Sequence, residues 1–370
     1  MRTSVPLGKA FGVPVFLHFS SIVIIALFMY ILAYQDIPVA GLPVGFGNMH
    51  VSLAVKLVLG LVVAVLFIAS VLLHELAHSW LAVSMGYKVA GITIFIFGGV
   101  SQMEEMPKDP KQELKVAFVG PATSLALGVA FLGGFLAMGS APPGTAFEAI
   151  SISLGTLAFY NLVLGVFNLV PAFPTDGGRV LRAGLAMRMS MREATRIAAG
   201  VGKAMAIGMA VLGLLTFNLW FILIAAFIYM GGSQEEQGTL VSLALEHHHV
   251  SEVMLPNVDT VPPTMTLAEL YAFMWAHRQL GYPVIDGGNL VGLVTFDHLR
   301  GIGQDQLPTV RVGDVMQRQV LTAAPLDDAM EAFKRLVRGP GDMLVVMDAG
   351  RVVGTVTQAD FMRAVKLAGG

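Results

Sequence analysis

Residues 57–78 read L-V-L-G-L-V-V-A-V-L-F-I-A-S-V-L-L-H-E-L-A-H, an uncharged apolar run that ends in three polar side chains. The run is long enough to cross a bilayer, since a spanning helix needs about 20 mostly apolar residues. On a helix, His74 and His78 are one turn apart, so both imidazoles project from one face and can hold one zinc ion. Glu75 lies about 100° further round the axis, where its carboxylate can act as a general base. The stretch therefore predicts a membrane helix that carries a metal site.

Chance is the alternative explanation, because H-E-x-x-H also arises at random and buried histidines are often satisfied by their neighbours. Ionisable groups at membrane depth are costly and are usually functional. The position of these three residues, directly after an uncharged run, favours the metal site.

The composition separates two regions of the chain. Of its 370 residues, 55% are hydrophobic and only 13% are charged, where an ordinary soluble protein has about 25% charged residues. The long apolar runs fill the first two thirds, so we predict a transmembrane domain over 1–232, a linker over 233–250 and a soluble region after it. The chain has no cysteine, so zinc ligands must be His and carboxylate. A net charge of −2 gives no reason to expect a nucleic-acid partner.

Six apolar runs are candidate membrane spans, at residues 15–34, 55–84, 116–138, 150–170, 197–215 and 217–231. The loops 35–50 and 139–149 contain no Lys or Arg. The basic residues occupy the alternate segments, as Arg2, Lys9, Lys88, Lys108, Lys111, Lys115, Arg179, Arg182, Arg188, Arg192 and Arg196. The chain is then a multi-pass protein of the cell membrane, and the positive-inside rule predicts that both of its termini face the cytoplasm.

A catalytic zinc site usually has three protein ligands and an open position. Asp176, in N-L-V-P-A-F-P-T-D-G-G-R at 168–179, follows the fourth span just as the two histidines close the second. Both spans run in the same direction, so the two motifs meet near the cytoplasmic face. The alternative is that Asp176 serves only as the N-cap of the next helix.

These motifs together resemble the site-2 protease family of intramembrane metalloproteases. The resemblance rests on H-E-L-A-H at 74–78 and F-N-L-V-P-A-F-P-T-D-G-G-R at 167–179, supported by G-P-A-T-S at 120–124 and G-V-P-V-F-L-H at 12–18. It implies one zinc ion per chain held by His74, His78 and Asp176, with Glu75 as catalytic base. Asn161 matches a position implied to orient the substrate or stabilise the oxyanion. Thr175 stands where a Leu is common.

A transmembrane protein, cut within the lipid bilayer, is the substrate that the resemblance implies. Its helix must unwind before its peptide bonds are accessible. The β-rich stretch 91–97 is too short to span the membrane and predicts an edge strand that holds an extended substrate by β-addition. A re-entrant hairpin packed against the helices is the alternative.

From residue 251 the chain repeats with an offset of 62, as in Val253-Met254 and Val315-Met316. Each copy predicts strand, helix, strand, strand, helix. The repeats, at 251–310 and 311–370, resemble a tandem pair of CBS domains, which implies a regulatory adenine nucleotide such as ATP, ADP or AMP and a homodimer.

A G-x-x-T-x-x-D pattern holds the ribose and phosphate in the CBS family, and the second repeat has it as Gly354, Thr357 and Asp360. In the first repeat Asp297 comes one residue early after Thr295, so that repeat departs from the pattern. The alternative is a dimerising module without a ligand.

The predicted fold is a multi-pass α-helical membrane protein with about six transmembrane helices and a short β-hairpin region, followed by an α/β tandem CBS pair. The predicted function is intramembrane zinc endopeptidase, regulated by adenine nucleotide. One alternative is a CBS-gated transporter or channel with a structural metal site, although the spans show no internal repeat. Another is a zinc protease that trims prenylated proteins, which leaves the Asp-Gly-Gly element and the CBS pair without a reason.

Overall fold

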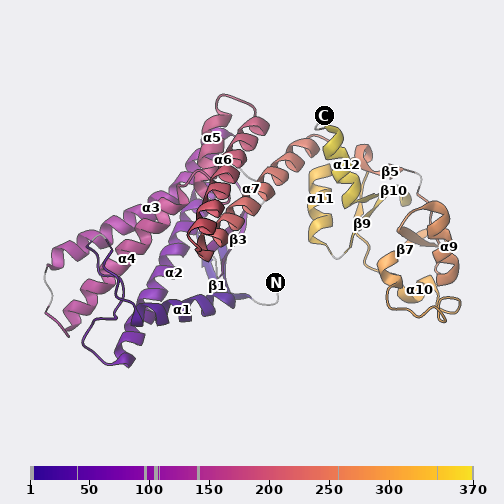
Figure 1. Ribbon diagram of the computed structural model, residues 1–370. Coiled ribbons are helices and arrows are strands. Elements are labelled where there is room, and N and C mark those ends of the chain that lie inside the picture. The colour runs from indigo at the N-terminus through magenta and orange to yellow at the C-terminus, as the bar shows by residue number, and fades with distance from the viewer. Residues whose placement is uncertain are drawn as a thin grey trace. The chain divides into compact units, whose positions relative to one another are not determined.

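The computed structural model describes residues 4–39, 41–95, 98–103, 107, 109–139, 142–256, 258–339 and 341–368. The chain divides into two compact units, Met1–Glu236 and Gln237–Gly370, and Figure 1 labels their elements. The last helix of the first unit, α7 (Leu219–Leu245), continues through most of the segment predicted as a linker.

Long apolar helices build the first unit. In the described part of the chain four are long and apolar enough to cross a membrane: α2 (Leu53–Ser84), α3 (Pro110–Met138), α4 (Ala146–Asn168) and α6 (Met191–Leu215). A fifth apolar helix, α1 (Ser20–Tyr34), is shorter, with 15 residues. The prediction of a multi-pass helical region is confirmed, and four of the six predicted spans meet the length and composition that crossing requires.

Polar residues set the starts of these helices. The side chains of Ser52, Asp109 and Thr145 accept hydrogen bonds from the first backbone N–H groups of α2, α3 and α4. Ser190 and Glu193 form a reciprocal capping box at the start of α6. Each cap satisfies a donor that the helix cannot pair internally.

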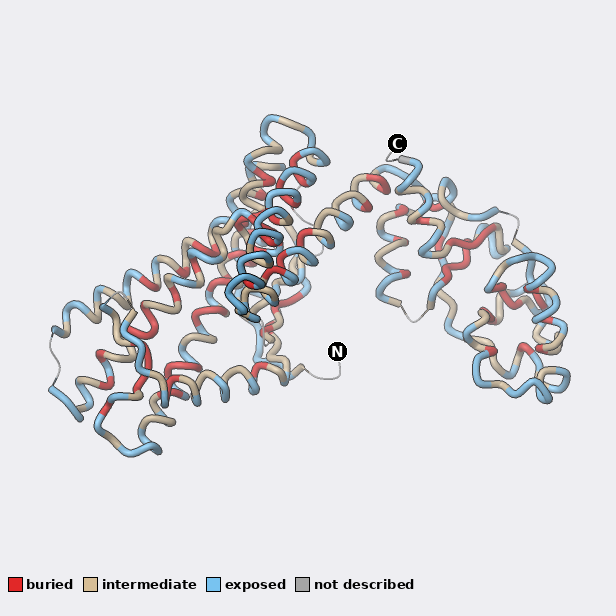
Figure 2. Tube along the Cα trace, viewed as in Figure 1, coloured by how far each residue is buried: buried red, intermediate tan, exposed pale blue. Residues whose placement is uncertain are grey.

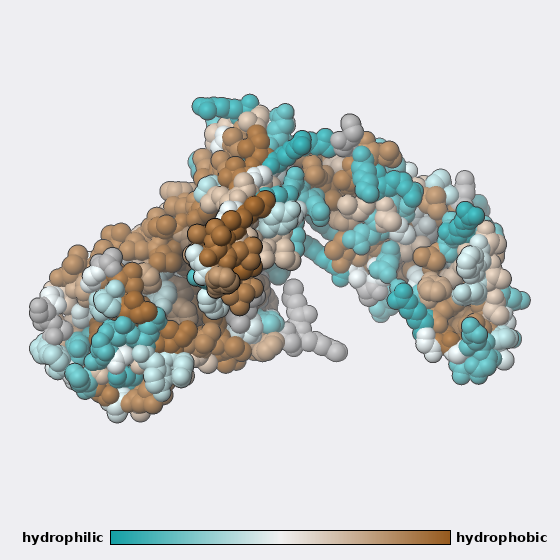
Figure 3. Space-filling model, in the orientation of Figure 1, coloured by the Kyte–Doolittle hydropathy of each residue, from teal (hydrophilic) through white to brown (hydrophobic). Residues whose placement is uncertain are grey.

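The outer surface of the first unit is strongly apolar. Figure 3 shows broad hydrophobic areas over it, and buried positions alternate with exposed ones along α2, α3 and α4 (Figure 2). Phe217, Leu215 and Trp220, at the turn between α6 and α7, are exposed by 95%, 74% and 73%. A soluble protein rarely exposes apolar area on this scale, so lipid is the medium that suits this unit.

A four-stranded sheet lies in the first unit, in the order β1 (Ser4–Ala10), β2 (Val13–His18), β3 (Val89–Phe95), β4 (Gly98–Met103). Strands β2 and β3 are parallel, and the other neighbours are antiparallel.

Two predictions are corrected by this sheet. Residues 15–18 belong to a strand and not to the first span, because Val15 pairs with Ile92 of β3 and Leu17 packs against the apolar core that contains Ile92. Strand β3, which contains residues 91–95 of the predicted edge strand, is an inner strand. The edge strand on this side of the sheet is β4, which pairs with β3. Residues 96–97 of the predicted strand lie outside the described residues.

A buried ion pair anchors α5 (Asp176–Ala186), the helix that begins at the third candidate ligand. Arg182 is 3% exposed, and its Nε donates to Oε1 of Glu113 on α3 at 2.8 Å. Its Nη1 donates to Oε1 of Glu235 on α7 at 3.0 Å, and its guanidinium lies over the ring of Phe173. Two segments that are distant in the sequence, α3 and α7, are thereby tied to α5.

The second unit contains the two CBS repeats. The first has α9 (Leu267–His277), β6 (Gly281–Asp286), β7 (Asn289–Thr295) and a 3-10 helix, η1 (Phe296–Leu299); the second has β8 (Thr322–Ala323), α11 (Ala329–Arg338), β9 (Met343–Asp348), β10 (Arg351–Thr357) and α12 (Gln358–Ala368). The predicted order is present in both. The first strand of the first repeat is a single bridge, between Val261 and Val284.

The repeats exchange the short segments that precede them. The helix α8 (Val250–Val253) and strand β5 (Leu255–Pro256) pack on the second repeat, and β5 pairs with β10. The helix α10 (Val312–Val315) contributes Val312 to the core of the first repeat.

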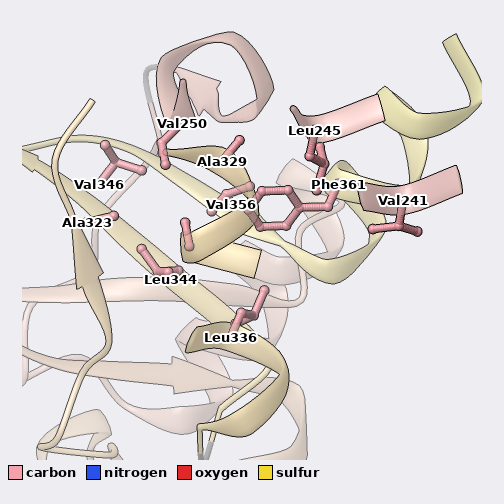
Figure 4. Close-up of a cluster of buried hydrophobic side chains, with 11 residues drawn as sticks. Val241, Leu245, Val250, Ala323, Ala329, Leu336, Leu344, Val346, Val356 and Phe361 are labelled. Atoms are coloured by element: carbon pink, nitrogen blue, oxygen red, sulfur yellow. The ribbon is translucent and has the colours of Figure 1, made fainter. Parts of the chain in front are cut away.

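The core of the second repeat also receives the end of α7. Figure 4 shows Val241 and Leu245 beside the ring of Phe361, in one buried apolar cluster. The end of the helix is therefore part of the CBS unit.

Replacing Arg182 by Met should destabilise the first unit by about 3–5 kcal/mol, because Glu113 is then left as a buried charge without a partner. The midpoint of thermal unfolding in detergent measures the loss. Lys203→Met is the matched control, since the Lys203–Glu236 pair is partly exposed and should contribute about 0–1 kcal/mol. Equal effects of the two substitutions would contradict this prediction.

Candidate metal centre

His74, His78 and Asp176 converge on one point. The Nε2 atoms of the two histidines are 3.2 Å apart, and each is 3.2 Å from Oδ2 of Asp176. The histidines are 3% and 6% exposed. Within the described ranges this is the one group of three or more His, Cys, Asp or Glu residues with ligand atoms this close.

The spacing of the three atoms fits one tetrahedral zinc ion. Zn–N and Zn–O bonds of about 2.0–2.1 Å place adjacent ligands of a tetrahedron about 3.3 Å apart, close to the 3.2 Å observed. The Nδ1 of His78 is 2.6 Å from the carbonyl oxygen of Val116. A carbonyl only accepts, so Nδ1 carries the proton, and Nε2 of the neutral ring presents a lone pair to the cluster.

Helix α3 faces both imidazoles at three positions four residues apart, and two of these positions supply their hydrogen-bond partners. The Val116 carbonyl binds His78, and Oγ of Ser124 lies 2.9 Å from Nδ1 of His74. Gly120 lies between them, and a Cβ there would be 2.1 Å from His78 Nε2 and 2.8 Å from His74 Nε2. The helix can approach the rings this closely only because position 120 has no side chain.

Asp176 reaches the histidines from the first turn of α5. The N-cap residue is Thr175, so the alternative that Asp176 is only an N-cap does not hold. The hydroxyl of Thr175 donates to the carbonyls of Val170 and Ala172, at 2.6 and 2.8 Å. A Cβ at Gly177 would lie 2.3 Å from the Val170 oxygen, so the Pro-rich loop can fold back on the helix only with glycine there.

Glu75 is half-buried next to the edge strand β4. A Cβ at Gly99 would lie 2.3 Å from Cγ of Glu75, so the backbone of β4 lies directly against this side chain. One turn along α2, Oγ of Ser79 is 2.8 Å from Oγ of Ser101 on the same strand. Two contacts thus hold the edge of the sheet beside the candidate base.

Asn161 is fully buried in α4. Its Nδ2 donates to the Leu157 carbonyl at 2.8 Å, and its Oδ1 is buried without a hydrogen-bond partner. No hydrogen bond joins it to His74, His78 or Asp176 among the contacts described. A buried polar atom that lacks a partner is uncommon and is a candidate for a ligand contact.

The candidate nucleotide residues of the second repeat lie at the end of β10 and the start of α12. Oδ2 of Asp360 accepts from the Thr357 backbone N–H at 3.0 Å and from its hydroxyl at 2.6 Å. Gly354 has a packing role, because a Cβ there would lie 2.7 Å from Sδ of Met254.

In the first repeat the residue paired with Thr295 is His298, whose Nδ1 accepts from the Thr295 backbone N–H at 3.0 Å. The Asp297 carboxylate instead pairs with Arg300. The sequence analysis missed His298, although the offset of 62 aligns it with Asp360.

Comparison with known proteins identifies the family. The model of peptidase family M50 matches residues 62–215, and the CBS domain model matches 250–303 and 312–367. A zinc metalloprotease of Methanocaldococcus jannaschii is 32% identical over 371 residues, which cover 99% of this chain and 97% of the relative. The chain belongs to peptidase family M50, the site-2 proteases.

A second relative agrees with this assignment. Rip3 of Mycobacterium tuberculosis, which bears the name of a zinc metalloprotease, is 34% identical over 99% of this chain and 93% of its own length. A solved site-2 protease from Methanocaldococcus jannaschii is 33% identical, with a TM-score of 0.44, and covers 63% of this chain and 95% of that chain.

This M50 protein is therefore a membrane zinc metalloprotease with a tandem CBS pair. Its family implies zinc as the cofactor and membrane proteins in a bilayer as substrates. The alternative of a CBS-gated transporter or channel is not favoured.

Replacing Ser124 by Ala should weaken zinc binding by about 10–100-fold, because the hydroxyl that orients His74 is lost. Chelator competition on the purified full chain measures the dissociation constant directly. Ser124→Thr keeps the hydroxyl and should restore most of the affinity. Thr123→Ala is the matched control, since that hydroxyl donates to the Val119 carbonyl of its own helix and has no bond to either histidine among the described contacts. Unchanged affinity in Ser124→Ala would remove Ser124 from the site.

Proposed function

We propose that His74, His78 and Asp176 hold one catalytic zinc ion, and that the protein cuts transmembrane substrates there with Glu75 as the base. The observation that carries the proposal is the convergence of three ligand atoms, mutually 3.2 Å apart, from two segments separated by about a hundred residues. Zinc bound at this point polarises the scissile carbonyl and lowers the pKa of a bound water to about 7.

Glu75 moves the proton in this proposal. Its carboxylate accepts a proton from the attacking water and returns it to the nitrogen of the leaving amine. The position beside β4 supports this role, because the same contact places the base next to a strand edge where a peptide can lie.

Asn161 is proposed to contact the substrate. Its Nδ2 has a second N–H beyond the bond to Leu157, which suits a developing oxyanion. Its unpaired Oδ1 suits a backbone N–H of an extended peptide. Both roles require the substrate to reach the buried face of α4.

The edge of β4 is the proposed docking position of the unwound substrate. In the described part of the sheet, β4 has a strand on one side only. Backbone hydrogen bonds to that edge are independent of side-chain sequence, so they can hold many substrates in the extended form that hydrolysis needs. The contact between Gly99 and Glu75 supports this position, because a peptide paired with that edge would have a peptide bond near the proposed base.

The protein is proposed to cross the cell membrane six times. The Lys and Arg distribution supports an orientation in which both termini and the CBS pair face the cytoplasm. An adenine nucleotide bound through Gly354, Thr357 and Asp360 is the proposed regulator, and ATP, ADP and AMP are the candidates. A homodimer formed through the CBS pair stays a prediction, which the mass of the protein in nanodiscs checks.

Glu75→Gln should keep zinc but lose cleavage, since the base moves a proton and does not hold the ion. Asp176→Asn and His78→Ala should lose both. Zinc content by mass spectrometry and hydrolysis of a transmembrane reporter in proteoliposomes give the two readouts. Asp109→Asn is a matched carboxylate control, because Asn is an equally good N-cap for α3. Cleavage by Glu75→Gln at the wild-type rate would contradict the role of Glu75 as the base.

Asp360→Ala should abolish any effect of ATP, ADP or AMP on reporter cleavage while zinc content stays at the wild-type level. The physical reason is the loss of the ribose acceptor, which removes the difference in affinity through which a ligand shifts an equilibrium. Asp297→Ala, an exposed carboxylate in the other repeat, should behave as wild type. A nucleotide effect that survives Asp360→Ala would place the ligand elsewhere.

A further inference from the structure

The two CBS repeats share one backbone frame around the candidate ligand residues. Gly292 and Gly354 occupy equivalent positions, and a Cβ on either would meet a methionine sulfur, of Met316 at 2.5 Å and of Met254 at 2.7 Å. Three residues further on, Thr295 and Thr357 end equivalent strands. The backbone frames agree at these two positions of the G-x-x-T-x-x-D pattern. The third position, three residues after the Thr, is where the two sites differ.

That position is Asp360 in the second repeat and His298 in the first. Thr357 donates its backbone N–H and hydroxyl to Oδ2 of Asp360. The backbone N–H of Thr295 donates to Nδ1 of His298 at 3.0 Å, and its hydroxyl lies 3.1 Å from the same atom. His298 therefore forms a capping box with Thr295, as Asp360 does with Thr357.

Asp297 does not replace the missing carboxylate. Its Oδ1 is 3.0 Å from Nε of Arg300, and both side chains are largely exposed, by 56% and 73%. It is thus paired at the surface, outside the cap.

The two caps leave different chemistry for a ligand. Oδ1 of Asp360 is not used in the cap. It lies 3.6 Å from Nη1 of Arg363, whose side chain is largely exposed, and it keeps a lone pair that can accept a hydrogen bond from a ligand. An imidazole that accepts with Nδ1 has used its one lone pair, and its Nε2 carries the proton and only donates. A vicinal ribose diol, which donates through two O–H groups, finds an acceptor beside Thr357 and none from the residue that replaces it beside Thr295.

We propose that His298 is the specificity-determining residue that prevents the first repeat from binding a nucleoside ribose. Each chain then binds one adenine nucleotide, in the second repeat, and His298→Asp alone creates a second site. This inference rests on the proposed nucleotide function of the CBS pair.

The test is a count of bound nucleotides per chain, by equilibrium dialysis of the full-length protein in nanodiscs against radiolabelled AMP and ATP. We expect one per chain for the wild type, two for His298→Asp and none for Asp360→Ala. His298→Asn is the matched control, because its amide oxygen can cap the helix but it lacks the second carboxylate oxygen. It should stay at one per chain. Thermal unfolding checks that each variant is folded.

The outcomes separate this inference from the function on which it rests. Two nucleotides per wild-type chain, or one per chain in a folded His298→Asp variant, would overturn the role of His298. No binding to the wild type but one nucleotide bound to His298→Asp would refute the nucleotide function and still support the role of His298. No binding to any of the proteins would refute both.

Discussion

The rest of the first unit depends on one constraint, which is that two buried imidazoles on a membrane helix need partners for their ring nitrogens. Each ring has two nitrogens, and no water in the hydrocarbon core can satisfy them. The Nε2 atoms face each other and Asp176, so the Nδ1 atoms need partners from protein. Helix α3 supplies both, through the Val116 carbonyl and the Ser124 hydroxyl. The close approach of α3 to α2, and the glycine between those partners, follow from this need.

Asp176 has to reach the same point from another helix, which imposes a second set of close contacts. The loop before α5 folds back so tightly that Gly177 and Gly178 face backbone atoms of residues 169–173. The Thr175 hydroxyl lies within hydrogen-bonding distance of two carbonyls of that loop and shares its one proton between them. Further along α5, Arg182 is buried against Glu113. Either charge would be strongly destabilising at this depth without the other. The position of the third ligand is thus determined by packing on two sides.

The CBS pair shows that packing and ligand chemistry can change independently. His298 and Asp360 make the same cap, so either residue satisfies the fold. They differ in the atom that remains for a ligand, which is a donor in one repeat and an acceptor in the other. A substitution at this position can therefore alter binding at little cost in stability.

The sequence by itself determined the multi-pass helical character of the first unit, the order of the CBS elements and the candidate ligands His74, His78 and Asp176. Apolar runs of spanning length and a one-turn spacing of histidines have few other physical explanations. It did not reveal strand β2, because a short apolar run can form a strand or a helix turn equally well. It could not reveal the partner of His78 either, since a backbone carbonyl such as that of Val116 exists at every residue. Only the tertiary structure decided which backbone groups meet the side chains of the site, because those contacts depend on how segments distant in sequence pack together.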